Sequence, residues 1–252
     1  MIDLHSHVLP GLDDGATDVS DAMELARAMA ADGTSTVCGT PHVRDDYPTS
    51  PAAMSASLQR VRTAINEAGI AIDVRGGGEI ALDQLARLET DTLRQFGLGG
   101  NPNLLLLEAP YANWPLDLGR ICGRLRHDGI VPVLAHPERN TAIQEHPLAL
   151  EEFVRAGGFV QLTAASVDGR LGKAAAACAQ TLLELELAHV IASDAHGVGV
   201  REAGLSSAVR AVGGGDLGRW LTYDVPASLL AGEVLPPRPS ASRRGLLRRL
   251  RP

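Results

Sequence analysis

Seven short apolar runs alternate with amphipathic stretches along most of the 252 residues, and this alternation limits the fold more than any other feature. Helical stretches lie between the runs; one is expected to extend from a Ser20 cap to Gly33, and another from Pro51 to Gly69. Strands that are apolar throughout and are separated by helices predict a parallel sheet covered by helices. We therefore expect an α/β fold, with the seven units forming a closed or nearly closed barrel; an open doubly wound sheet is the alternative. The predicted strands are residues 2–4, 36–39, 72–76, 104–108, 131–135, 159–163 and 189–193.

The composition argues against several classes of protein. Apolar residues make up 45% and charged residues 21%, as in a globular protein. The formal charge of −7 argues against nucleic-acid binding, which needs a basic surface. No stretch resembles a signal peptide or a transmembrane segment. Three widely spaced cysteines do not suggest a disulfide framework, so we expect a cytoplasmic protein.

The end of the chain departs from this balance. We expect residues 1–232 to form the folded domain and the proline- and arginine-rich residues 233–252 to form a flexible tail. The last 15 residues, RPSASRRGLLRRLRP, contain six arginines and no acidic residue. Such a tail is typical of a solvated, disordered segment, or of a weak contact with a membrane surface or a partner protein.

Residues that can bind a metal follow almost every predicted strand. Because the carboxyl ends of parallel strands in a barrel converge on one face, these residues are expected to meet there. The strand at 159–163 is the exception. One pair of histidines separated by a single residue is weak evidence, but six such placements at the same end of six strands predict a metal site. The residues are His5, His7, His42, Glu79, Glu108, His136, Asp194 and His196.

The segment GLDDGA could add one more ligand. Asp13 and Asp14 lie at the correct face, and we choose Asp14 to complete a coordination shell. Three further histidines do not follow strands and are interpreted as structural: His127, His146 and His189.

Together these motifs resemble a known family. DLHSH, GTPH, AHPER and SDAH, with the two glutamates, are similar to the polymerase and histidinol phosphatase (PHP) superfamily. HSHVLPGLDDGA, TPHV, HPERN and SDAHGVGVR resemble more narrowly its bacterial protein-tyrosine phosphatases of capsular and exopolysaccharide systems. The resemblance extends from Met1 to about Leu230 and implies a distorted seven-stranded (β/α)7 TIM-like barrel, the PHP fold, in a single domain.

The resemblance also implies a cluster of three divalent metal ions, commonly Mn²⁺; the ligand types would also suit iron or zinc. The first ion would be held by His5, His7, Glu79 and Asp194. Glu79 would bridge to the second ion, which Glu108 and His136 also bind. The third would be held by His42, His196 and Asp14.

The chemistry expected of such a site is hydrolysis of a phosphate ester. A metal-bridging hydroxide would attack phosphorus, and Arg139 and Arg201, directly after ligand motifs, would hold the phosphate oxygens. The resemblance implies phosphotyrosine in a protein as substrate, with a bacterial tyrosine autokinase as partner. The alternatives are a small-molecule phosphatase, such as histidinol-phosphate phosphatase, and a non-catalytic regulator that keeps the metals.

A competing pattern is the C-x5-R spacing from Cys38 to Arg44, which is typical of cysteine-dependent tyrosine phosphatases. Pro41 removes one of the backbone N–H groups that such a loop needs around the phosphate, and Asp45 and Asp46 would repel the anion. Cys38 also falls within an apolar run, where a buried and inert thiol is expected. The sequence therefore favours the metal-dependent chemistry.

Overall fold

The structure, a computed structural model, describes residues 1–112, 114–197 and 201–239. The strands are β1 (Ile2–Ser6), β2 (Thr36–Gly39), β3 (His42–Arg44), β4 (Tyr47–Pro48), β5 (Asp73–Gly76), β6 (Glu79–Ala81), β7 (Leu104–Glu108), β8 (Val131–Ala135), β9 (Phe159–Thr163) and β10 (Val190–Ala192). The α-helices are α1 (Val19–Ala31), α2 (Pro51–Glu67), α3 (Thr90–Gln95), α4 (Leu118–His127), α5 (Thr141–Glu145), α6 (Glu151–Arg155), α7 (Ala164–Val167), α8 (Lys173–Glu184), α9 (Ser206–Ala211), α10 (Gly215–Arg219) and α11 (Val225–Ala231). Short helical turns are η1 (Leu82–Ala86), η2 (Leu98–Gly100), η3 (Pro137–Arg139), η4 (Pro147–Leu150) and η5 (Trp220–Asp224).

The strands form two sheets. The smaller has the order β1-β2-β5, and the larger has the order β10-β9-β8-β7-β6-β3-β4. All paired strands are parallel except β3 and β4. A single parallel bridge from Ser6 to Ala195 joins the end of β1 to the segment after β10. The α/β fold is therefore confirmed, whereas hydrogen bonding among the described residues does not close a seven-stranded barrel.

The chain crosses from one sheet to the other in two places, each just before a predicted metal ligand. After β2 the residues Thr40 and Pro41 interrupt the strand, and β3 begins at His42 in the larger sheet. After β5 two glycines lead to β6, which begins at Glu79. A Cβ added at the second of them, Gly78, would lie 2.8 Å from the Phe96 ring, so this close approach requires glycine. The two ligands thus start short strands, rather than following the ends of longer ones.

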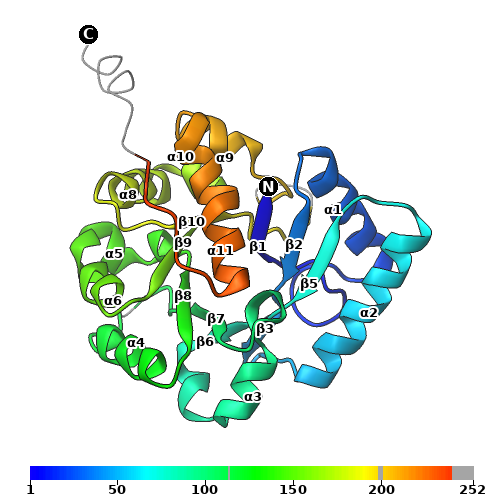
Figure 1. Cartoon of the computed structure of the whole chain (residues 1–252), viewed down its shortest axis with the longest axis horizontal. Coiled ribbons are helices and arrows are strands. Elements are labelled where there is room, and N and C mark those ends of the chain that lie inside the picture. Colours follow the sequence, from blue (N-terminus) through cyan, green and yellow to red (C-terminus); the bar gives the residue numbers. More distant parts are fainter. Residues whose placement is uncertain (113, 198–200, 240–252) are drawn as a thin grey trace.

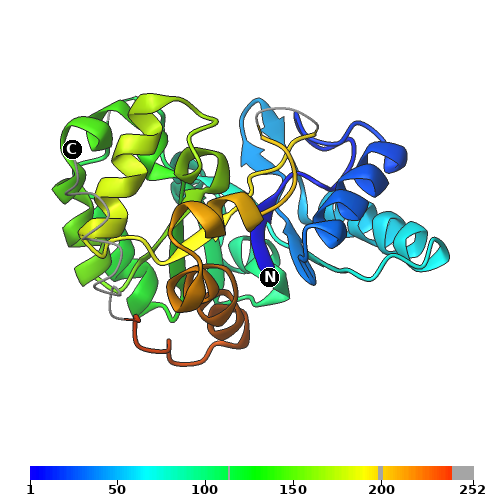
Figure 2. The ribbon, with the colours of Figure 1, turned by 90° about the horizontal axis from the view of Figure 1, so that it is seen from above.

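Helices surround the strands, with α1 and α2 beside the smaller sheet and α4, α5, α6 and α8 around the larger one (Figures 1 and 2). Strand β7 has an apolar core on both sides. Leu104 and Leu106 belong to one buried cluster, and Leu105 and Leu107 belong to the other. This is the reason why the run LLLLE is apolar throughout, as expected of a parallel strand covered on both faces.

All seven predicted strands are present, with small differences at their ends. The predicted start of the first helix was wrong. Its N-cap is Asp18, whose side chain accepts from the backbone N–H of Asp21, and Ser20 lies inside α1. Asp and Ser are both favoured N-caps, so composition alone could not separate them. The helix α2 begins at Pro51 as expected, after the capping side chain of Ser50.

Part of the segment after position 232 lies against the folded domain, at Pro236 and Arg238. The guanidinium of Arg238 donates to the backbone oxygens of Ala188 and Leu183 at 2.8 and 2.9 Å and lies 5.2 Å from the Trp220 ring centroid. Trp220 Nε1 in turn donates to the Pro236 oxygen at 3.0 Å. The remaining five arginines of the predicted tail, in 240–252, lie outside the described residues. None of the helices in the described part of the chain has the length and hydrophobicity needed to cross a bilayer.

His189 has a structural position, in agreement with its interpretation from the sequence. Its Nδ1 accepts from the Val160 N–H at 3.2 Å, and its ring meets the edge of Phe159 at 5.2 Å. Burial, assisted by the charge of Arg238, lowers the pKa of His189 to about 4. Between about pH 4 and about pH 6.5, His189 therefore binds a proton in the unfolded chain but not in the folded chain.

This pKa predicts a loss of stability as the pH falls. Between pH 7.5 and pH 5 the contribution of His189 to the free energy of unfolding should decrease by about 2 kcal/mol. We therefore expect the stability difference between the wild type and His189→Gln to shrink by that amount over the same interval. Urea unfolding of both proteins at the two pH values measures it. A difference that does not change with pH would contradict the prediction.

Candidate metal centre

The structure brings all nine predicted metal-binding residues into one cluster. Their nitrogen and oxygen atoms form four overlapping groups, each with its atoms within 4.8 Å of one another. The groups are His7, Asp14, His42 and His196; His5, Glu79 and His136; His5, His7 and Asp194; and His42, Glu79 and Glu108. Because the groups share members, they form one continuous set of candidate ligands. His127 and His146 belong to none of them and are exposed.

His5, in β1, and His7, just after the end of β1, form the buried base of the cluster. His5 Nδ1 lies 2.9 Å from Gln161 Oε1, and His7 Nδ1 lies 2.6 Å from Asp13 Oδ2. Each oxygen accepts a hydrogen bond from the Nδ1–H group, which leaves the lone pair of each Nε2 free to bind a metal. The two Nε2 atoms face each other at 3.2 Å. Two buried lone pairs at this distance repel each other, so the arrangement fits a cation that both nitrogens coordinate.

Glu79 is the central carboxylate of the cluster. Its Oε1 lies 2.7 Å from His136 Nε2, and its Oε2 lies 2.9 Å from His42 Nδ1. The same Oε2 is 3.3 Å from His5 Nε2 and 3.4 Å from His7 Nε2. Burial alone would raise its pKa, but the surrounding histidines outweigh burial and hold the pKa well below the usual value. Glu79 is therefore ionised, as a carboxylate that bridges two cations must be.

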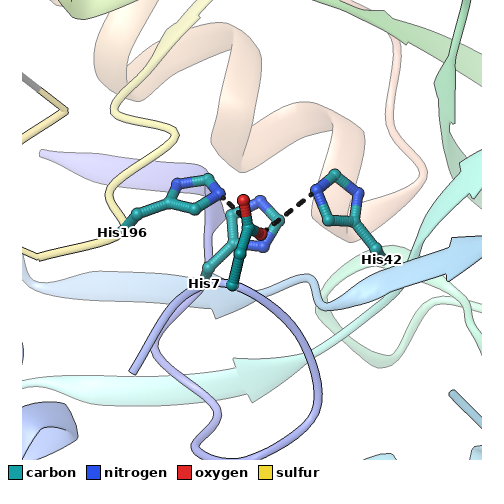
Figure 3. A group of neighbouring side chains, drawn as sticks. His7, His42 and His196 are labelled. Carbon is teal, nitrogen blue, oxygen red and sulfur yellow. Dashed lines mark ion pairs between the residues drawn. The ribbon is translucent and has the colours of Figure 1, made fainter. Parts of the chain in front are cut away.

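Asp14 connects the outer histidines. Its Oδ1 lies 3.5 Å from His42 Nε2 and 3.3 Å from His196 Nε2 (Figure 3). The side chain is 38% exposed, so this group forms the mouth of the cluster. The neighbouring Asp13 is turned inward, where it holds His7 and accepts from the His42 backbone N–H at 3.0 Å. A Cβ added at Gly15 would lie 2.3 Å from the His7 Cβ, so only glycine lets this loop approach β1 so closely.

Glu108, at the end of β7, faces the Nδ1 atom of His42, whereas Asp14 faces its Nε2 atom. Its Oε2 is 3.5 Å from His42 Nδ1 and 3.4 Å from the guanidinium of Arg44. Burial and the charge of Glu79 raise the pKa of Glu108. Its Oε1 is buried without a hydrogen-bond partner in the described part of the chain. Buried oxygens without partners are costly unless a cation binds them, so this donor set also fits a metal.

Two ligand candidates lie on strained backbone. His136 and Asp194 have φ of 34° and 52°, in the left-handed region that residues with a Cβ rarely adopt. Both follow strands of the larger sheet, and Asp194 N donates to the His5 oxygen at 2.8 Å. Such strain persists where the surrounding structure holds it, and it is concentrated at functional sites. Here it turns both side chains toward β1.

Both predicted arginines reach the same carboxylate. Arg139 Nη1 lies 2.7 Å from Asp194 Oδ2, and Arg201 Nη1 lies 3.5 Å from it. Arg201 Nη1 is also 2.9 Å from His196 Nε2. Arg139 is 18% exposed and Arg201 is 26% exposed, so both guanidinium groups lie at the rim of the cluster. They are placed where an anion above the cluster would meet them.

Sequence reasoning did not assign three residues of this site. Gln161 lies in β9, the strand for which the sequence predicts no metal ligand. The sequence does not distinguish Asp13 from Asp14 by position, and Arg44 stands out only through its spacing from Cys38. A polar residue inside the apolar run FVQLT was the available signal for Gln161. The place of Asp13 depends on the path of its loop, and that of Arg44 on the short strand β3; spacing alone reveals neither.

The structure rules out the cysteine-dependent alternative. Cys38 is fully buried in β2, and burial raises the pKa of its thiol, so it is not a nucleophile. Arg44 pairs with Asp46 at 2.8 Å and with Glu108 instead of facing the sulfur.

Comparison with known proteins shows the family to which the chain belongs. The family model for capsular polysaccharide synthesis, CpsB/CapC, matches residues 1–229. The tyrosine-protein phosphatase YwqE of Bacillus subtilis is 36% identical over 80% of this chain and 79% of its own length. The tyrosine-protein phosphatase CpsB of Streptococcus pneumoniae is 26% identical over 80% of this chain and 85% of its own.

Solved structures support the same relationship. A crystal structure from work on YwqE of Bacillus subtilis and CpsB of Streptococcus pneumoniae, described as unique metal-dependent tyrosine phosphatases, superposes with a TM-score of 0.84. The match has 32% sequence identity and covers 96% of this chain and 100% of the other. The resemblance inferred from the motifs is thereby confirmed: the chain belongs to the CpsB/CapC family of capsular polysaccharide synthesis.

Proposed function

We propose that this chain is a metal-dependent phosphatase that hydrolyses phosphotyrosine in proteins. The observation that carries the proposal is the approach of His5 Nε2 and His7 Nε2 to each other at 3.2 Å, with both facing Glu79 and Asp194 at 3.3 to 3.4 Å. A buried set of nitrogens and carboxylates of this kind is suited to divalent cations. The relatives named as tyrosine phosphatases support the choice of substrate.

Three divalent ions would fit the overlapping groups, and the share of carboxylates favours Mn²⁺, with iron or zinc as alternatives. His5, His7, Glu79 and Asp194 would hold one ion. The second would lie between Glu79, Glu108 and His136. The third would be bound by Asp14, His42 and His196.

When bound, such ions lower the pKa of a water molecule and offset the charge of the phosphate. The protein's own residues do the positioning. Gln161 and Asp13 fix the orientation of His5 and His7. Arg139 and Arg201 would share their donors between Asp194 and two phosphate oxygens, and the guanidinium fork matches that geometry.

We infer the biological setting from the same comparisons. In a capsule or exopolysaccharide system the phosphoprotein would be a bacterial tyrosine autokinase, and the reaction would take place in the cytoplasm. Residues 1–232 would be sufficient for activity, because every residue of the cluster lies within them. The two sheets would be parts of one distorted barrel, since the Ser6–Ala195 bridge joins their edges.

Hydrolysis of a phosphotyrosine peptide, measured together with bound metal, tests the proposal. We expect EDTA to abolish the activity, Mn²⁺ to restore it, and a thiol alkylator to have little effect because Cys38 is buried. Activity that survives EDTA but is lost to the alkylator would overturn the metal-dependent mechanism. A higher kcat/KM for histidinol phosphate than for the peptide would instead identify a small-molecule phosphatase. A metal-replete protein inert toward both would be a non-catalytic regulator.

A further inference from the structure

Tyr111 lies beside the metal centre in a chain that has only three tyrosines. Its ring is nearly parallel to that of His136, at 7° with the ring centroids 6.0 Å apart. The guanidinium carbon of Arg139 lies 4.9 Å from the centre of the same ring. The side chain is nevertheless 42% exposed. Tyr111 therefore contacts one predicted metal ligand and one predicted phosphate-binding residue, and still presents part of its ring to solvent.

The loop that carries Tyr111 is held in place by the segment after His136. The side-chain amide of Asn140 donates to the Pro110 oxygen at 2.6 Å, and its Oδ1 accepts from Ala142 N at 2.8 Å. Thr141 N adds a longer contact to the Tyr111 oxygen at 3.4 Å. Asn140 is 3% exposed, so these bonds are sheltered from water. The ring is thus positioned before a substrate arrives, and little ordering entropy remains to be lost on binding.

We propose that Tyr111 is a specificity-determining residue, whose exposed ring stacks on the aryl group of the substrate. The inference rests on the proposed function and deepens it. Arg139 contacts the Tyr111 ring, so the ester group of a phosphate bound by Arg139 would lie next to that ring. An aromatic ester group gains a stacking contact there, whereas a short alkyl group does not. The site would therefore prefer aryl over alkyl phosphates before any chemistry begins.

Binding of two phosphonates to the Mn²⁺-loaded protein tests this role. Phenylphosphonate and methylphosphonate share the phosphate-like head and differ in the aromatic ring. We expect Tyr111→Ala to raise the dissociation constant of phenylphosphonate by about three- to tenfold, and that of methylphosphonate by less than about twofold. Tyr111→Phe, which keeps the ring, should behave as the wild type. Isothermal titration calorimetry measures all these constants without requiring turnover.

The chain offers a matched control. Tyr223 is also 42% exposed and also lies against an arginine, with the Arg219 guanidinium carbon 5.4 Å from its ring centroid. It lines a surface hollow with Met1, at the opposite end of β1 from His5. Tyr223→Ala should change neither dissociation constant.

Other results would overturn the inference. If Tyr111→Ala raises the dissociation constants of both phosphonates equally, the ring only positions Arg139. If neither dissociation constant changes, the ring does not contact the ligand. Failure of the proposed function looks different. In that case the wild type would not hydrolyse a phosphotyrosine peptide, whatever the two phosphonates show.

Discussion

Replacement of Glu79 by glutamine is expected to lower kcat/KM for an aryl phosphate by a factor on the order of 10³. The reason is its central position, with four histidines within 3.4 Å of its two oxygens. Glutamine has nearly the same shape but no charge, and its amide presents donors where a cation would need acceptors. Two of the proposed ions would lose the carboxylate that joins them. Elemental analysis of the purified variant should therefore show a lower metal content than the wild type.

The same experiment separates loss of metal from loss of fold. Circular dichroism of the wild type after EDTA gives the reference for a folded, metal-depleted chain, and Glu79→Gln should match it. A variant that keeps its full metal content and stays within about tenfold of wild-type activity would exclude Glu79 as a bridging ligand.

Replacement of Arg139 by methionine is expected to reduce kcat/KM by about 10²- to 10³-fold with the metals retained. Arg139 Nη1 lies 2.7 Å from Asp194 Oδ2, and in the proposed function it shares its donors with a phosphate. Methionine keeps most of the apolar stem and removes the charge. The inhibition constant of inorganic phosphate should increase by at least about tenfold, since the product makes the same contact as the substrate.

Arg219→Met is the matched control for this variant. Arg219 pairs with Asp224 at 3.0 Å and lies over Tyr223, so it repeats the carboxylate and aromatic partners of Arg139 away from the cluster. It should leave activity and phosphate inhibition unchanged. If Arg139→Met lowers the metal content but leaves the affinity for phosphate intact, its role is to support Asp194 and not to bind substrate.

The positions of seven of the ten described strands, and the direction in which the cluster faces, were predictable from the sequence. Apolar runs such as LLLLE and VPVLA are distinct enough to locate β7 and β8, and parallel pairing then brings Glu108 and His136 to the same end of the sheet. That inference requires only local patterns and one rule of topology. The role of these residues as metal ligands stays a prediction.

The details that were missed depend on the path of loops. Asp13 and Asp14 are adjacent and chemically identical, and the path of the loop, with Gly15 packed closely on His7, turns Asp13 inward. The transfer of the chain from the smaller to the larger sheet before His42 and Glu79 is likewise a tertiary event. The stacking of Tyr111 on His136 joins two loops that no sequence period relates. A single sequence contains no local signal for such contacts.

The bridge between Ser6 and Ala195 has a consequence for how the protein matures. The residues nearest this bridge come from two segments far apart in the sequence: His5 and His7 lie in and just after β1, and Asp194 and His196 follow β10. A nascent chain on the ribosome would therefore expose His5 and His7 long before Asp194 and His196 are synthesised. The assembled cluster should then bind metal during the last steps of folding. A truncated or incompletely synthesised chain should therefore be inactive.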